Sequence, residues 1–191
     1  LALETFIVFA VENYHPGSTS LVTEGIRQKH TWLQAGLTYE NFFVNRGNYR
    51  LGFLGKAFYS SQDYFSNYTS SILSSSAFQP IPESCVRFIP HLRANKYVAA
   101  GFKNIYKLHK NVDLRLEAFA FMPTRGIEQT PITRLATNAE KLKVWPIASA
   151  STVFFSPVGP ISLSLNYFNG DNEPWSFFLK FGYLIFNKRP L

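Results

Sequence analysis

The stretch Gly159–Phe186, GPISLSLNYFNGDNEPWSFFLKFGYLIF, decides the fold. Apolar side chains occupy every second position on both sides of the turn at 170–174: Ile161, Leu163, Leu165, Tyr167, Trp175, Phe177, Leu179, Phe181, Tyr183 and Ile185. Because successive side chains of a strand point to opposite faces, this pattern predicts two strands that share one wholly apolar face. The other face is polar, small or mixed, and it carries Lys180 in mid-strand.

The length of these strands and the places of their aromatic residues indicate which solvent the apolar face meets. A soluble sandwich also alternates, but a strand of roughly 9–11 residues with aromatic ends and an aliphatic middle is typical of a transmembrane β-barrel. The pattern therefore favours a membrane barrel over a sandwich. The residues that we assign to its aromatic girdle are Tyr49, Tyr59, Tyr167, Trp175 and Tyr183.

The composition supports the same class. Of the 191 residues, 17% are aromatic and only 16% are charged, whereas about a quarter of the residues in a soluble domain are charged. The net charge is +7, but the Lys and Arg residues are scattered and form no nucleic-acid motif, so we expect no nucleic-acid partner. Basic loops that meet anionic lipid headgroups explain the charge better. The single cysteine, Cys85, excludes an internal disulfide.

We predict an all-β fold, an antiparallel transmembrane β-barrel with about eight strands in this chain. The predicted strands are 1–12, 30–43, 49–60, 96–108, 112–123, 145–156, 160–169 and 175–186. In 112–123, every second residue counted in both directions from Leu116 is apolar, and the opposite face carries Asp113 and Glu117. The two faces of 145–156 are alike, so the sequence does not orient this strand.

The connections between these strands alternate between long and short, apart from the last one, 170–174, which is short and polar. The short ones lie at 44–48, 109–111 and 157–159, and the long ones at 13–29, 61–95 and 124–144. Outer-membrane barrels have short periplasmic turns and longer extracellular loops. We therefore place the chain in a bacterial outer membrane with its short turns in the periplasm.

The connection at 61–95 is too long and too apolar for an ordinary surface loop. It contains Tyr64, Phe65, Tyr68, Ile72, Leu73, Phe78, Val86, Phe88, Ile89 and Leu92. We expect this segment to pack against the rest of the chain, with the barrel lumen as the nearest place. The alternative is that 68–76 forms an additional strand.

Charged side chains on the polar strand faces are expected to line the lumen, where they pair or are hydrated. These residues include Arg50, Lys56, Lys103, Arg115 and Lys180. A lysine or arginine on the lipid-facing side near the membrane centre costs about 2–4 kcal/mol. Asp113 and Glu117 lie on one face of one strand, which suits them to receive an arginine from the infolded loop.

Several segments resemble one group of proteins. They are Phe65–Thr69 (FSNYT), Ala77–Ser84 (AFQPIPES), Arg93–Gly101 (RANKYVAAG), Gly159–Tyr167 (GPISLSLNY), Pro174–Phe177 (PWSF) and Phe181–Lys188 (FGYLIFNK). These segments resemble the C-terminal membrane domain of the patatin-like phospholipases of Bacteroidetes-type bacteria.

This resemblance implies a longer protein, in which a patatin hydrolase and a POTRA-like segment precede a 16-stranded barrel of the outer-membrane insertase and two-partner-secretion superfamily. Residues 1–191 then form one domain, the C-terminal half of that barrel. Its implied partners are the missing N-terminal half, the barrel-assembly machinery, and outer-membrane lipids with lipopolysaccharide. Segment 61–95 matches the superfamily loop that folds into the lumen. The motif arginine of that loop corresponds to Arg87, in Val86-Arg87-Phe88, or to Arg93, and it pairs with acids such as Asp113 or Glu117.

The chain itself carries no signs of catalysis. It has no G-x-S-x-G nucleophile elbow, and its four histidines are too far apart in sequence to suggest a metal site, so we expect no catalytic residues, no metal and no cofactor. Since no export signal opens the sequence, we expect a fragment of a longer protein. Two alternatives stay open: an independent eight-stranded porin-like or structural barrel, and a soluble lipid-binding β-barrel.

Overall fold

The computed structural model describes residues 1–15, 25–129, 136–138 and 143–182. Antiparallel strands make up most of this part of the chain, which confirms the all-β class. The strands are β1 (Ala2–Tyr14), β2 (Ile26–Arg46), β3 (Tyr49–Ser60), β4 (Ser76–Ala77), β5 (Arg93–His109), β6 (Val112–Gln129), β7 (Ala136–Asn138), β8 (Trp145–Ser156), β9 (Gly159–Phe168) and β10 (Trp175–Phe181). The helical segments are α1 (Tyr68–Ser74) and the 3-10 turns η1 (Pro82–Cys85) and η2 (Pro90–Leu92).

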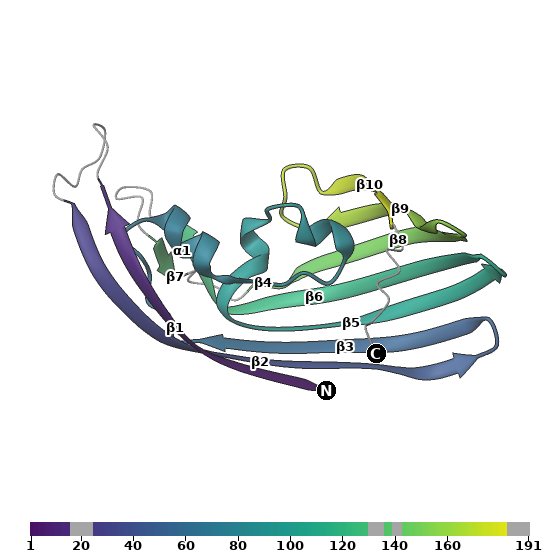
Figure 1. The fold of residues 1–191 in the computed structure, drawn as a ribbon, viewed down its shortest axis with the longest axis horizontal. Coiled ribbons are helices and arrows are strands. Elements are labelled where there is room, and N and C mark those ends of the chain that lie inside the picture. The colour runs from purple at the N-terminus through teal and green to yellow at the C-terminus, as the bar shows by residue number, and fades with distance from the viewer. Residues whose placement is uncertain (16–24, 130–135, 139–142, 183–191) are drawn as a thin grey trace, which may run out of the picture. The chain divides into compact units, whose positions relative to one another are not determined.

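Each long strand pairs with the next long strand along the chain, as in a meander (Figure 1). The hydrogen-bonded order is β1-β2-β3-β5-β6-β8-β9-β10, with β4 added to β5 and β7 added to β6. All eight predicted strands are present, although β1, β2, β5 and β6 run further than expected, and positions 183–186 of the last predicted strand lie outside the described residues. Among the described strands, β1 and β10 stand at the two ends of this order.

The short connections are two-residue hairpin turns, at 47–48, 110–111 and 157–158. Gly47 adopts φ +55° in the first of them, a backbone conformation that glycine adopts without steric cost. Neighbouring hairpins are also joined by backbone hydrogen bonds. Lys107 N donates to Asn48 O at 2.7 Å, and Phe155 N donates to Asn111 O at 2.8 Å. The predicted short turns are therefore confirmed.

The chain divides into two compact units. The first comprises 1–40, 55–100 and 120–145, and the second comprises 41–54, 101–119 and 146–191. In the second unit, Ile147 and Phe168 are almost completely buried. Beside them, the buried Ser149 hydroxyl donates a hydrogen bond of 2.7 Å to Asn166 Oδ1. One face of the strands of this unit therefore buries apolar side chains together with a hydrogen-bonded polar pair.

Buried and exposed side chains alternate along the strands, on the faces that the sequence pattern predicts. In β6, Phe119 and Phe121 are buried, whereas Leu116 on the other face is 40% exposed. Strand β8, which the sequence does not orient, turns Ile147 and Val153 inward. We call the buried side of the strands the inner face and the opposite side the outer face.

Gly101 marks a close approach of β5 to β6. A Cβ built on this residue would lie 2.3 Å from both Ala118 O and the Phe119 ring, whereas a Cβ on Gly36 would lie 3.5 Å from the Phe58 ring. Gly101→Ala should therefore force β6 away and lower the free energy of unfolding by about 1–3 kcal/mol, as overpacking does. Chemical denaturation measures this loss. The control, Gly36→Ala, should be close to neutral, and an equal loss in both variants would contradict the close approach.

Candidate functional site

The connection between β3 and β5, residues 61–92, is the most elaborate part of the first unit, and we call it the β3–β5 loop. It contains α1, β4, η1 and η2, which Figure 1 shows lying along one face of the strands. Five of its apolar side chains, Ile72, Phe78, Ile81, Ile89 and Leu92, are each at most 4% exposed, whereas Leu73, Val86 and Phe88 are each at least 49% exposed. The expectation that this segment packs against the rest of the chain is confirmed.

The serine-rich part of the loop forms a helix and not the additional strand that we kept as the alternative. Asn67 caps α1, since its side-chain oxygen accepts a hydrogen bond of 2.7 Å from Ser70 N. The Ser71 and Ser74 hydroxyls donate to the carbonyls of Asn67 and Ser70, four residues earlier. Serines in such positions satisfy backbone groups locally. A seven-residue helix is unstable in isolation, so α1 depends on the burial of Ile72 against the sheet.

An aromatic cluster joins the β3–β5 loop to the inner face. The ring of Phe78 stacks on Phe121 of β6 with centroids 5.7 Å apart, and Tyr97 of β5 lies 4.9 Å from Phe121. Phe58 of β3 also stacks on Tyr97, with ring centroids 5.5 Å apart. Such ring pairs contribute about 0.5–1.5 kcal/mol each beyond the burial of their area. The cluster therefore ties the loop to three neighbouring strands.

A buried carboxylate fixes the beginning of the loop. Glu12 of β1, whose side chain is 7% exposed, accepts a hydrogen bond of 2.7 Å from Ser66 N through Oε1. Its other oxygen lies 3.0 Å from His30 Nε2, and the His30 ring packs edge-on against Phe65 at 4.7 Å. We call this group the Glu12 anchor. Nothing in the sequence pointed to a partner of Glu12 that lies 54 positions away.

The two candidate motif arginines have partners within the loop. Arg87 lies 3.5 Å from Glu83, one helical turn earlier in η1. Arg93 donates hydrogen bonds of 3.1 Å and 3.0 Å to the carbonyls of Leu73 and Ser75. Arg93 thereby holds the C-terminal end of α1.

The acids expected to receive these arginines belong to the second unit. Asp113 is buried, and its carboxylate lies 4.0 Å from both Arg50 and Arg115. Glu117 lies on the same face of β6 and is half-buried. Arg87 and Arg93 belong to the first unit, so their pairing with Asp113 or Glu117 stays a prediction.

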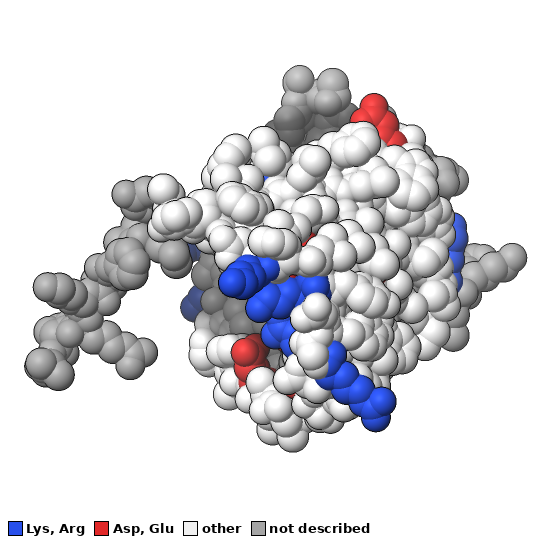
Figure 2. All heavy atoms as spheres, turned by 90° about the vertical axis from the view of Figure 1, so that its right-hand side faces the viewer, with Lys and Arg blue, Asp and Glu red and all other residues white. Residues whose placement is uncertain are grey.

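The remaining candidate lumen charges differ in exposure. Lys56 and Lys103 are half-buried, whereas Lys180 is exposed. The space-filling view of the side where the short turns lie shows a group of Lys and Arg side chains (Figure 2). Whether the inner face lines a lumen stays a prediction.

The candidate girdle residues make paired contacts. Tyr49 donates a hydrogen bond of 2.9 Å to Asn104 Oδ1, and the Tyr167 ring lies 4.8 Å from exposed Trp175. Tyr59 is 46% exposed. Tyr183 lies outside the described residues.

Removing the Glu12 carboxylate should loosen the β3–β5 loop. Glu12→Ala leaves Ser66 N and His30 without this acceptor, which costs about 1–3 kcal/mol for buried groups. Hydrogen exchange in residues 61–75 should accelerate, while the middle of β5 should keep its protection. Glu4→Ala, which removes an exposed carboxylate from the same strand, is the control. Unchanged exchange in Glu12→Ala would show that the anchor does not hold the loop.

Searches of the described residues and comparisons with known proteins add no further identification. The described part of the chain holds no group of three or more metal-ligating side chains. None of its helices is both long and apolar enough to cross a membrane. No family model, curated protein or solved structure matches the chain. The resemblance to patatin-like phospholipases therefore rests on the sequence segments alone.

Proposed function

We propose that this chain is part of an outer-membrane β-barrel that anchors a patatin-like lipid acyl hydrolase located upstream of it. The observation that carries the proposal is the exposed apolar outer face, which is present on strands of each of the two units. Its large side chains, each at least 39% exposed, include Leu3, Ile7, Phe9, Leu33, Leu37, Tyr59, Val98, Phe102, Tyr106, Leu116, Phe154, Leu163, Trp175, Phe177, Leu179 and Phe181.

A face of this kind needs an apolar partner. Monomeric soluble proteins rarely expose large contiguous apolar patches. An extended patch marks a surface that meets another protein or a lipid phase, and in the second unit the exposed apolar side chains occur on β8, β9 and β10. Aromatic residues stand near the strand ends at Tyr49, Tyr59 and Trp175, where a barrel crosses the membrane–water interface. These features favour lipid as the partner.

The strand order implies the second partner. Strand β1 pairs with β2 and β10 pairs with β9, so each of them presents a further edge of backbone N–H and C=O groups. Lipid cannot satisfy such groups. We therefore assign the N-terminal half of a 16-stranded barrel as the element that completes the sheet. Its insertion would use the barrel-assembly machinery.

The link to lipid hydrolysis comes from the family resemblance. In the proposed protein the barrel holds the hydrolase at the outer membrane, where its lipid substrates are, and displays or translocates it. The chain described here supplies no catalytic residue in this proposal. The chemistry belongs to the upstream domain.

Heat-modifiable migration tests the membrane assignment. The complete protein should partition into the outer-membrane fraction, and after detergent extraction it should migrate differently on SDS gels when it is not boiled. Recovery in the soluble fraction would favour the lipid-binding β-barrel. A G-x-S-x-G elbow encoded upstream, with lipase activity lost on replacing its serine, supports the hydrolase. An upstream sequence without this elbow would favour the independent porin-like barrel.

Adjacent residues of β9 test which face meets lipid. Leu163 is 55% exposed on the outer face, and Ser162 points to the inner face. Leu163→Arg should destabilise the folded protein by about 2–4 kcal/mol if it lies near the membrane centre. The neighbouring Ser162→Arg should cost clearly less. Urea unfolding in lipid vesicles measures both, and equal losses would contradict the assigned faces.

A further inference from the structure

Lys96, near the start of β5, separates two hollows of different character in the first unit. Its ammonium group lies 4.5 Å from the centroid of the Tyr59 ring. It borders a polar pocket at the end of β3 and an apolar groove on the outer face. No other residue of these two hollows contributes to both of them.

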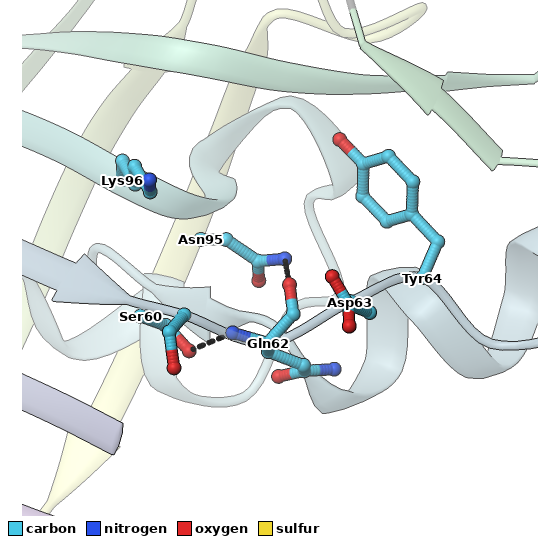
Figure 3. A pocket seen from close by; sticks show the side chains of 7 residues that line it. Ser60, Gln62, Asp63, Tyr64, Asn95 and Lys96 are labelled. Atoms are coloured by element: carbon cyan, nitrogen blue, oxygen red, sulfur yellow. Dashed lines mark hydrogen bonds between the residues drawn. The ribbon is translucent and has the colours of Figure 1, made fainter. Parts of the chain in front are cut away.

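The polar pocket, of about 250 Å³, is shown in Figure 3. Its lining residues are Ser60, Ser61, Gln62, Asp63, Tyr64, Asn95 and Lys96. Part of the wall is rigid, because Gln62 N donates to Ser60 Oγ and Asn95 Nδ2 donates to Gln62 O, both at 3.2 Å. Asp63 adds an exposed carboxylate. The pocket therefore joins one negative and one positive side chain.

Two buried acceptors of this pocket have no hydrogen-bond donor in the described part of the chain. They are Gln62 Oε1 and Asn95 Oδ1, on side chains that are 7% and 6% exposed. A buried acceptor without a donor costs free energy. Both oxygens have almost no accessible surface, so a ligand in the pocket does not reach them. The exposed Asp63 carboxylate is the acceptor that a ligand reaches, and it favours a ligand group that carries N–H or O–H donors.

The apolar groove, of about 370 Å³, lies on the outer face. It is hollow because Ala35 and Ala57 are small, while larger side chains border them. Its outer-face lining includes Leu3, Leu37, Tyr59 and Val98, each at least 43% exposed. A hydrocarbon chain fits such a surface.

We propose that the polar pocket and the apolar groove form one binding site for a phosphatidylethanolamine-type lipid. The acyl chain lies in the groove and the phosphate contacts Lys96. The ammonium group donates to the exposed Asp63 carboxylate. One positive and one negative side chain match a zwitterionic headgroup. This inference rests on the proposed membrane location and adds a lipid selectivity to it.

Choline provides a matched comparison, since phosphatidylcholine has the same net charge and the same chains but no N–H donor. With the complete protein in detergent micelles, native mass spectrometry should show one retained phosphatidylethanolamine, and phosphatidylcholine should bind roughly tenfold more weakly. The thermal midpoint should rise only with the former lipid. Equal retention of both lipids would overturn the inference, although heat-modifiable migration would still support the membrane proposal.

Three variants separate the parts of the site. Lys96→Gln and Asp63→Asn should remove most of the preference for ethanolamine, and Ala57→Leu should fill the groove and weaken retention of both lipids. Lys29→Gln, which removes an exposed lysine outside both hollows, should behave as the wild type. Glycerophosphoethanolamine, the headgroup without chains, should not raise the thermal midpoint. A rise with this soluble compound equal to that with the lipid would assign the pocket to a free metabolite and overturn the lipid site.

Discussion

The packing of the β3–β5 loop on the inner strand face is the interaction on which the first unit depends. The ring of Phe78, a residue of the loop, packs against Tyr97 and Phe121 of the strands. Burying one large apolar side chain contributes about 1.5–3 kcal/mol, and several loop residues are buried in this way. Because the loop packs its own side chains on the inner face of the first unit, the apolar outer face of this unit receives no cover from it. The exposed face is therefore a consequence of where the loop packs.

Polar contacts fix the position that the aromatic contacts stabilise. Ring packing tolerates sliding, whereas the Glu12 anchor requires a hydrogen bond to one backbone N–H, that of Ser66. A charged acceptor makes such a bond about twice as strong as a neutral one. Its burial also makes any other loop position expensive, since the carboxylate would then lack this donor. The aromatic cluster supplies most of the stabilisation of the loop, and the Glu12 anchor sets the position of the loop along the strands.

The strands and their faces were largely predictable, and the loop was not. Period-two alternation places Leu116 and Phe119 on opposite faces because it depends only on backbone geometry. It fails for β8, where the inner Ile147 and Val153 are as apolar as the outer residues, since the inner face is itself covered. In the loop, the run at 70–76 has little helix propensity of its own. Asn67 and the buried Ile72 impose the helix, and that burial is a tertiary effect that local sequence does not reveal.

Arg93 makes contacts inside the β3–β5 loop, and its pairing with an acid on the strands stays a prediction. A loop arginine that reaches an acid on the strands would stabilise the loop by a long-range ion pair, whose desolvation offsets much of its attraction. Arg93 donates to two carbonyls at the C-terminal end of α1, where a helix carries partial negative charge and unsatisfied acceptors. This contact needs no second buried charge. Arg93 therefore stabilises the fold of the loop itself. The Glu12 anchor, which does not involve either motif arginine, attaches the loop to β1.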